Sequence, residues 1–398
     1  MSVPVVNFWG DLDPSSRGVA PEIPTPDHIW DLDGGTAWVF HGVGHEQVTA
    51  PVILSDGFSG KPSSLTELWT GLEDGEFGFV SALRERGNDL ILLGYTDRTR
   101  PILENATIAT RCILRTIAER HGDIPLTVGG FSMGGLITRY ALAKMERGRI
   151  DHQTSTYVSY DTPHRGAWLP IGLQALLPFL LGQSRDIGEM IAMINSPAAR
   201  EMLRWRIDGV HGPAEQDPLR VEFLTALDRV GGWPTRPRRI GVANGRGDGG
   251  SVRSGDVALE VTGSALLGTT LYTQARGDAV VADLRREGQE PVLVRTNNLP
   301  EVDDAPGGTL FNFGLAAAAL AAFGIPTSTK LPSTCFVPTV SAIAIREIDD
   351  TDNVHADVRE LSSDDSGLDE YRCASTDEPH TTMTAELGTW ILDRIARR

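Results

Sequence analysis

The stretch that most constrains the fold of this chain is Leu126-Thr-Val-Gly-Gly-Phe-Ser132-Met-Gly-Gly-Leu136. A short apolar run leads into a serine with Gly130 two residues before it and Gly134 two residues after it. Because glycine has no Cβ, the chain can turn sharply here and hold the serine in a sparsely populated backbone conformation. The pattern G-x-S-x-G is weak alone and becomes meaningful between a strand and a helix. This setting predicts an exposed nucleophile at Ser132.

The residues after the serine have the apolar spacing of a helix, and Gly148 is placed to end it. The N–H of Met133 would open this helix and face an oxygen that gains negative charge. A glycine-rich turn with a bystander serine is the alternative, although a plain turn does not need glycines on both sides of a serine.

Strand-like and helix-like segments alternate along the chain. This alternation predicts an α/β fold in which right-handed crossovers build a mostly parallel central sheet flanked by helices. Residues 77–86 and 105–120 are expected to be helices, and residues 382–398 a closing helix. The expected strands are 36–41, 51–55, 90–93, 126–129, 156–160, 239–243 and 334–344.

Two segments interrupt this alternation, and the expected core is therefore residues 36–165 and 231–398. Residues 166–230 are helical and begin with apolar side chains that include Trp168, Leu169 and Leu173. We expect a lid or cap over the serine, with these three residues binding substrate, or else helices that extend the core. Residues 257–298 form a β-rich insertion with no function evident from sequence. Residues 1–35 are interpreted as an irregular N-terminal arm.

Charge and hydropathy exclude several classes of partner. The net charge of −17 argues against nucleic acid and anionic membrane surfaces, which are polyanions. The longest apolar run, residues 168–181, is too short and too interrupted to span a bilayer. The N-terminus has neither a basic segment nor a long apolar segment, so a cytoplasmic enzyme is expected, and a secreted mature form is also compatible.

Cysteines and acidic runs indicate neither a disulfide framework nor a metal site. Cys112, Cys335 and Cys373 are far apart, which favours reduced thiols. The acidic runs 349–352 and 364–365 lack the spacing of a calcium loop. No metal and no cofactor are therefore expected.

Four stretches resemble, in order, the α/β-hydrolase fold and in particular its lipase and esterase branch. They are the strand and loop ending in Asp56-Gly57-Phe58, the segment 130–134, the turn Asp161-Thr-Pro-His-Arg-Gly166, and Glu378-Pro-His380 before the last helix. The resemblance implies an oxyanion loop, a nucleophile elbow, a lipase-like Thr-Pro-His turn and a catalytic histidine. Together with Phe336-Val-Pro-Thr-Val-Ser341, these stretches also resemble a group of bacterial hydrolases without a well-defined substrate.

A serine hydroxyl needs an imidazole to remove its proton and a carboxylate to orient that imidazole. His380 is the expected base, and His355 is its main rival. Two aspartates compete as the acid. Asp161 follows a buried strand, whereas Asp248 lies in a glycine-rich loop after the next strand, which is the commoner location in this fold; Asp256 is a third candidate. Either of the first two gives the chain order Ser…Asp…His.

The resemblance implies that the N–H groups of Met133 and Phe58 hold the oxyanion. Asp56 departs from the family, because lipases usually carry histidine there and a carboxylate would repel the oxyanion. We expect it to turn away and bind backbone or an arginine, for which Arg165 is one candidate. His164 is expected to hold the turn beneath the pocket.

These residues predict a serine hydrolase that cleaves carboxylic esters of a hydrophobic acyl group through an acyl-enzyme intermediate. Its partner would be a small hydrophobic ester or thioester. A thioesterase, acyltransferase or cyclase acting on a biosynthetic acyl intermediate is the second hypothesis, and a non-catalytic binding protein is the third. Acyl length, leaving group and oligomeric state are not determined by the sequence.

Overall fold

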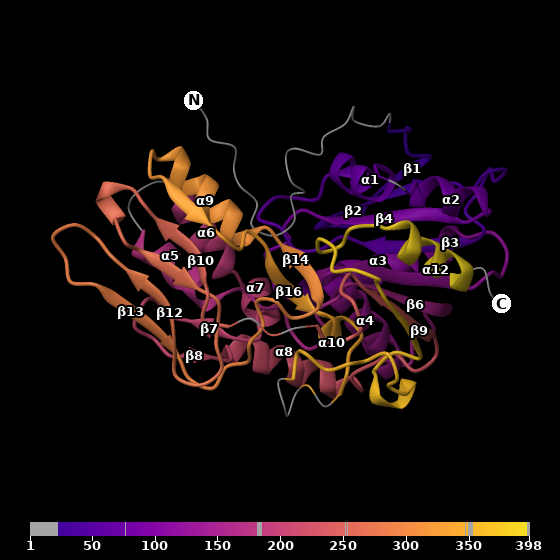
Figure 1. Ribbon diagram of the computed structural model, residues 1–398. Helices are drawn as coiled ribbons and strands as arrows, with labels where there is room; N and C mark the ends of the chain where they lie inside the picture. The colour runs from indigo at the N-terminus through magenta and orange to yellow at the C-terminus, as the bar shows by residue number, and fades with distance from the viewer. Residues whose placement is uncertain are drawn as a thin grey trace.

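The central element of the fold is an eight-stranded sheet, seen at the right in Figure 1. The computed structural model describes residues 23–75, 77–180, 185–250, 252, 254–346, 348 and 353–395. In spatial order the strands are β1 (His28–Asp31), β2 (Gly35–Phe40), β4 (Asp89–Tyr95), β3 (Pro51–Ser55), β5 (Leu126–Phe131), β6 (Thr154–Tyr160), β9 (Arg238–Ala243) and β17 (Glu370–Cys373). The six strands from β4 to β17 run parallel to one another, and β2 runs antiparallel to both of its neighbours, β4 and β1.

Helices cover both faces of this sheet, which explains why its inner strands are continuous apolar runs. Successive strand residues point to opposite faces, so Ile53 packs with α3 (Ile102–Glu119) and α4 (Met133–Arg147). Its neighbours Val52 and Leu54 pack with α1 (Leu65–Glu73), α2 (Phe79–Glu85) and α12 (Ala385–Ile395). The prediction of an α/β protein with a mostly parallel sheet flanked by helices is confirmed.

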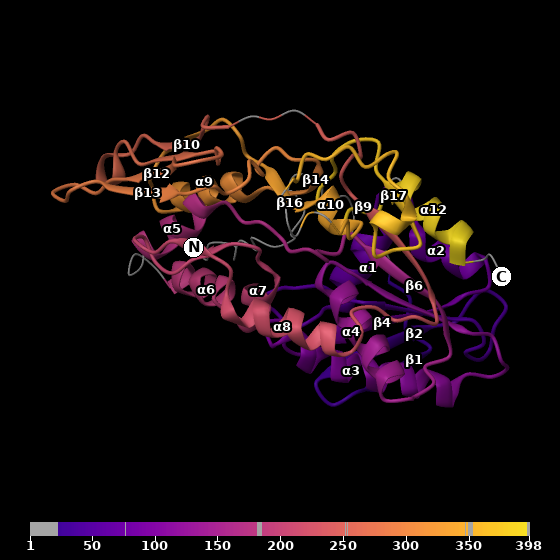
Figure 2. The same cartoon turned by 90° about the horizontal axis from the view of Figure 1, so that it is seen from below.

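A second, antiparallel sheet lies at the other end of the molecule (Figures 1 and 2). It packs against α5 (Ile171–Phe179) and α9 (Asn312–Ala322). The β-rich insertion is therefore larger than the expected residues 257–298, because the chain returns after α9 to add one more strand. The strands in order are β13 (Val292–Thr296), β12 (Ala279–Leu284), β11 (Thr270–Tyr272), β10 (Val257–Val261) and β15 (Thr327–Thr329).

One strand prediction for the central sheet was wrong, and one strand of that sheet was not predicted. Residues 334–344 do not rejoin it: β16 (Thr334–Pro338) pairs with β14 (Gly307–Leu310) in a separate two-stranded ribbon and leads into α10 (Thr339–Ala342). The eighth strand is instead β17, which pairs with β9 alone at the edge of the sheet. An edge strand is half-buried and needs no continuous apolar run, so no apolar pattern marks β17.

The expected arm over residues 1–35 is ordered at its end, since residues 28–31 form β1 beside β2. Residues 1–22 lie outside the described part of the chain, as does the acidic run 349–352. Among the described residues no helix is both long and apolar enough to cross a membrane.

The described part of residues 166–230, where a helical insertion was predicted, contains four helices and one short pair of strands. Serine and aspartate caps followed by proline start two of its helices, at Ser196 and Asp217. Contacts with the core tie the insertion to the loops beside the central sheet, where Ala198 N–H donates to the carbonyl of Thr99 over 3.1 Å. The elements are α5, α6 (Arg185–Ile194), α7 (Pro197–Met202), β7 (Arg206–Ile207), β8 (Ala214–Glu215) and α8 (Pro218–Arg229).

Candidate active site

Ser132 stands at the sharp turn between β5 and α4, with φ 51° and ψ −123°. A positive φ is unfavourable for a residue with a side chain, so the surroundings must hold it there. Close backbone packing explains the neighbouring glycines. A Cβ on Gly130 would lie 2.5 Å from the Gly134 carbonyl carbon, and a Cβ on Gly134 would lie 2.3 Å from the Ser55 carbonyl oxygen.

His380, in the loop between β17 and α12, joins the serine to a carboxylate. Its Nε2 lies 2.8 Å from Ser132 Oγ, and its Nδ1 lies 2.7 Å from Asp161 Oδ2. A proton on Nδ1 satisfies both contacts, since Nδ1 then donates to the carboxylate and Nε2 accepts from the hydroxyl. All three side chains are more than nine-tenths buried. This hydrogen-bonded chain is able to take a proton from the serine hydroxyl.

Asp161, at the end of β6, is the aspartate that lies against His380. Its other oxygen, Oδ1, accepts a hydrogen bond from Asn244 N–H over 3.0 Å, and the residue has no exposed surface. Asp248 lies elsewhere: its Oδ1 accepts from Gly250 N–H and lies 3.4 Å from Arg246 Nε. The loop of Asp248 pairs with the chain near residue 357, which holds it away from the histidine.

Two other candidates from the sequence are also distant from this cluster. The ring nitrogens of His355 lie 3.0 Å from the carbonyl oxygen of Gly249 and 2.7 Å from that of Glu301. Asp256 lies at the start of the second sheet, where its N–H donates to Thr273 Oγ1.

The β14–β16 ribbon holds the loop of His380, a role that sequence reasoning missed. His380 N–H donates to the carbonyl of Thr309 over 2.8 Å, and Thr309 N–H donates to the carbonyl of Glu378 over 3.0 Å. From β16, the Phe336 ring meets the His380 ring edge-on, with centroids 5.0 Å apart. Two adjacent glycines, Gly307 and Gly308, mark a place where another part of the chain comes close. The strand that pairs with them, β16, is distant along the sequence, so the ribbon was not predicted.

The two expected oxyanion donors flank the serine. Met133 is the first residue of α4, so its N–H has no intrahelical acceptor four residues back. The loop that carries Phe58 lies on the elbow, because a Cβ on Gly57 would be 3.3 Å from Ser132 Cβ. Both residues therefore belong to backbone that packs directly around Ser132.

Asp56 binds Arg98, and the expected pairing with Arg165 was wrong. Asp56 Oδ2 accepts from Arg98 Nη1 over 2.8 Å and from Ser63 Oγ over 2.6 Å, and its Oδ1 accepts from Gly57 N–H over 2.7 Å. Burial raises the pKa of Asp56, and the charge of Arg98 opposes that rise. Arg98 follows β4, the immediate neighbour of β3, whereas Arg165 follows β6, two strands from β3 on its other side.

His164 packs inside the turn after β6, as expected. Its Nε2 lies 2.8 Å from Ser159 Oγ, and its ring contacts Trp233. Burial lowers the pKa of His164 well below its ordinary value, and the charges of Arg139 and Arg165 lower it further. A neutral imidazole therefore fills this position.

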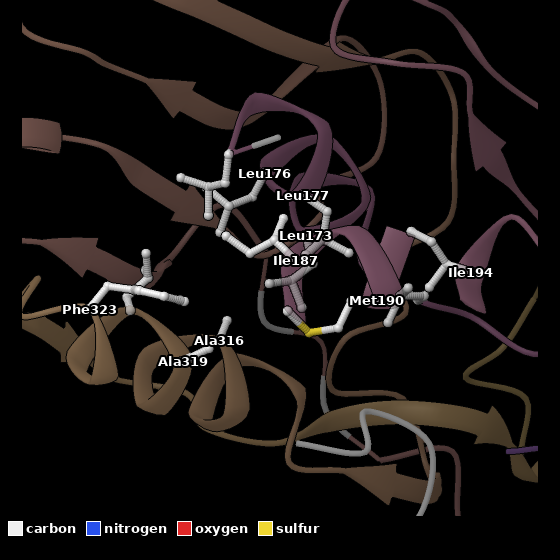
Figure 3. A pocket seen from close by; sticks show the side chains of 12 residues that line it. Leu173, Leu176, Leu177, Ile187, Met190, Ile194, Ala316, Ala319 and Phe323 are labelled. Atoms are coloured by element: carbon white, nitrogen blue, oxygen red, sulfur yellow. The ribbon is translucent and has the colours of Figure 1, made fainter. Parts of the chain in front are cut away.

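An apolar cavity of about 30 Å³ lies between α5, α6 and α9, lined by side chains that face one another in Figure 3. Leu169 and Leu173, two of the three predicted substrate-binding residues, belong to its lining. Trp168 does not: its side chain is buried elsewhere, and its backbone N–H donates to the carbonyl of Phe336 over 2.8 Å. Ala316, Ala319 and Phe323 complete one wall from α9. Sequence reasoning missed that wall because α9 is more than a hundred residues away along the chain.

The described residues contain no group of three or more His, Cys, Asp or Glu side chains that could hold a metal ion.

Comparison with known proteins gives only distant structural likenesses. No family model matches the chain, and no curated protein matches it. The mature lipase BlEst2 of Bacillus licheniformis aligns at 13% identity over 55% of this chain and 73% of its own, with a TM-score of 0.33.

Two further structures align to a similar extent. Est1E from Butyrivibrio proteoclasticus aligns at 14% identity over 54% of this chain and 76% of its own, with a TM-score of 0.31. The Pyrobaculum calidifontis esterase aligns at 13% identity over 54% of this chain and 74% of its own, with a TM-score of 0.30. All three are esterases or lipases.

Proposed function

We propose that the protein is a serine hydrolase that cleaves carboxylic esters through an acyl-enzyme intermediate. The observation that carries this proposal is the hydrogen-bonded chain from Ser132 through His380 to Asp161 on a strained elbow. A merely structural serine has no need for a positive φ, a buried imidazole and a buried carboxylate in line.

The reaction follows from the roles of these atoms. Ser132 Oγ attacks the ester carbonyl carbon while its proton passes to His380 Nε2, and Asp161 stabilises the imidazolium. The Met133 and Phe58 N–H groups hold the oxyanion. When the carbon–oxygen bond to the leaving group breaks, the imidazolium gives its proton to the departing alcohol. Water then attacks the acyl-enzyme by the same route and releases the acid.

The apolar cavity supports a hydrophobic acyl group as substrate. One wall of the cavity is linked to the site through neighbouring residues. Leu169, in this wall, follows Trp168, and the backbone N–H of Trp168 donates to the carbonyl of Phe336. The Phe336 ring in turn contacts the ring of His380. On the other side, a Cβ on Gly60 would lie 3.1 Å from Met193 Sδ of α6. A volume of about 30 Å³ is small for an acyl chain. In this proposal residues 166–230 act as a cap that opens to admit the chain.

A fluorophosphonate probe and a series of p-nitrophenyl esters from acetate to dodecanoate test this function. We expect the probe to label Ser132 and the esters to be hydrolysed, with turnover lost in Ser132→Ala. Ser81→Ala, at an exposed serine of α2, is the matched control and should retain both properties. A folded protein that is not labelled at Ser132, or a Ser132→Ala variant with full turnover, would refute the proposal.

A further inference from the structure

The loop that follows β3 is built around one buried ion pair. The side chains of Asp56 and Arg98 are 10% and 7% exposed, and Arg98 Nη1 lies 2.8 Å from Asp56 Oδ2. Every contact of the Asp56 carboxylate described above is with a hydrogen-bond donor, so both oxygens act as acceptors. This is the hydrogen-bond pattern of an ionised carboxylate.

Arg98 also binds the backbone further along the same loop. Its Nε donates to the carbonyl of Lys61 over 2.8 Å, and its Nη2 donates to that of Pro62 over 3.4 Å. Ser63 closes the loop onto the end of β4, since Ser63 N–H donates to the Tyr95 carbonyl and Tyr95 N–H donates to Ser63 Oγ. One planar guanidinium therefore fixes residues 56–63 at several points.

This loop is the one that packs on the serine. Asp56 Oδ1 holds the N–H of Gly57, and Gly57 lies against the Ser132 turn. Because the Gly57 N–H is turned onto the carboxylate, the orientation of the following peptide, which carries Phe58 N–H, is restricted as well. A shift of about 1 Å at such a donor is enough to cost a large part of a catalytic rate.

Besides its hydrogen bonds to the loop, Arg98 brings a positive charge close to the Asp56 carboxylate. An ionised carboxylate in the residue next to an oxyanion loop opposes the negative charge that develops on the substrate oxygen, and burial strengthens that repulsion. A guanidinium in direct contact with the carboxylate neutralises it. The pair therefore keeps the geometry of the loop without its electrostatic penalty.

We propose that Arg98 is a positioning residue for the reaction, acting through Asp56 to orient the Phe58 donor and to cancel the carboxylate charge beside the oxyanion. This inference rests on the proposed function. It differs from a purely structural role, in which the pair would hold the loop and affect stability alone.

The test compares Arg98→Met and Arg98→Lys with Arg111→Met. Arg111 is a matched control, because it too binds loop carbonyls, of Leu32 and Asp33, and a carboxylate, of Asp33, but it does so at the β1–β2 turn. Each variant is assayed for kcat and KM with an ester and with its thionoester. The sulfur of a thionoester is a larger and weaker hydrogen-bond acceptor, so its transition state gains less from the oxyanion donors.

We expect Arg98→Met to lower kcat for the ester about 100-fold with little change in KM, by comparison with loss of one oxyanion donor. The preference for the ester over the thionoester should fall as well. Arg98→Lys keeps the positive charge but lacks the planar guanidinium that binds several acceptors at once, and it should recover part of kcat. If Arg98→Met does not fold, Ser63→Ala, which removes one hydrogen bond to Asp56, should lower kcat and the same preference to a smaller extent.

Two outcomes separate the possible failures. If wild-type protein hydrolyses esters and Arg98→Met unfolds at lower temperature but keeps the kcat and ester preference of Arg111→Met, the pair is structural and the inference is wrong. If wild-type protein neither turns over esters nor reacts at Ser132, the proposed function itself fails.

Discussion

The backbone of Gly308 lies directly against the carboxylate of Asp161. A Cβ at residue 308 would be 1.9 Å from Asp161 Oδ2, the oxygen that contacts His380 Nδ1. This contact explains how a strand outside the central sheet, β14, comes to fix both the carboxylate and the loop of the histidine. The β14–β16 ribbon is therefore part of the support of the site.

Replacing Gly308 with alanine tests this relationship. The added methyl group must displace the carboxylate or the strand, so Gly308→Ala should lower kcat by about 100-fold or more. Gly71→Ala in α1 is the control, because a Cβ there meets nothing within 4 Å and should leave kcat unchanged. Steady-state kinetics on both proteins decides the matter. Equal kcat values would show that Asp161 adapts without losing His380.

The choice between the two candidate acids is testable by amide substitution. Asp161→Asn keeps the size of the side chain but removes the charge that supports the imidazolium, so kcat should fall about 10⁴-fold. Asp248→Asn should stay within a few-fold of wild type, because that carboxylate contacts Arg246 and Gly250 rather than His380. A larger loss in Asp248→Asn than in Asp161→Asn would reverse the assignment.

The apolar cavity predicts how acyl-length preference changes. Ala319 lines the cavity from α9, so Ala319→Leu should reduce kcat/KM for long acyl esters while sparing acetate. Ala318→Leu, at the exposed neighbour, should leave the chain-length profile as it is. Profiles measured over the p-nitrophenyl ester series compare the two variants. An unchanged profile in Ala319→Leu would place the acyl chain elsewhere.

Glu201 gives a pH dependence of stability. This buried residue of α7 accepts a hydrogen bond from Ile102 N–H of α3 over 2.6 Å and so joins the cap to the core. Burial raises its pKa from 4.5 to about 7, and the charges of Glu104 and Glu222 add to the rise. Between these two values the folded state keeps a proton that the unfolded state loses. The free energy of unfolding should therefore fall as pH rises through this window, by at most about 3 kcal/mol.

Denaturant unfolding of Glu201→Gln at several pH values checks this prediction. The amide stays neutral at every pH and keeps an acceptor for Ile102 N–H. The fall in the free energy of unfolding between pH 4.5 and about 7 should therefore shrink by the contribution of Glu201. Glu119→Gln, at an exposed glutamate of α3, should retain the wild-type slope. A Glu201→Gln variant with the full slope would assign the dependence to other groups.

Local patterns predicted the elements that lie around Ser132. The turn, the following helix and the strands from β2 to β6 were expected, because glycine spacing and apolar runs are properties of a few neighbouring residues. His380 was also a candidate, through its place before the last helix. By contrast, β17 and the β14–β16 ribbon were missed, since a half-buried edge strand and a short two-stranded ribbon carry little local signal.

The sequence by itself determined an α/β fold and a serine on a glycine-lined turn, since both depend on short-range sterics and periodicity. The tertiary structure alone decided three points: that Asp161 rather than Asp248 meets His380, that Asp56 pairs with Arg98, and that α9 closes the apolar cavity. Each is a contact between residues distant along the chain. The order of strands in the sheet and the packing of the second sheet bring those residues together, and no local pattern encodes that order.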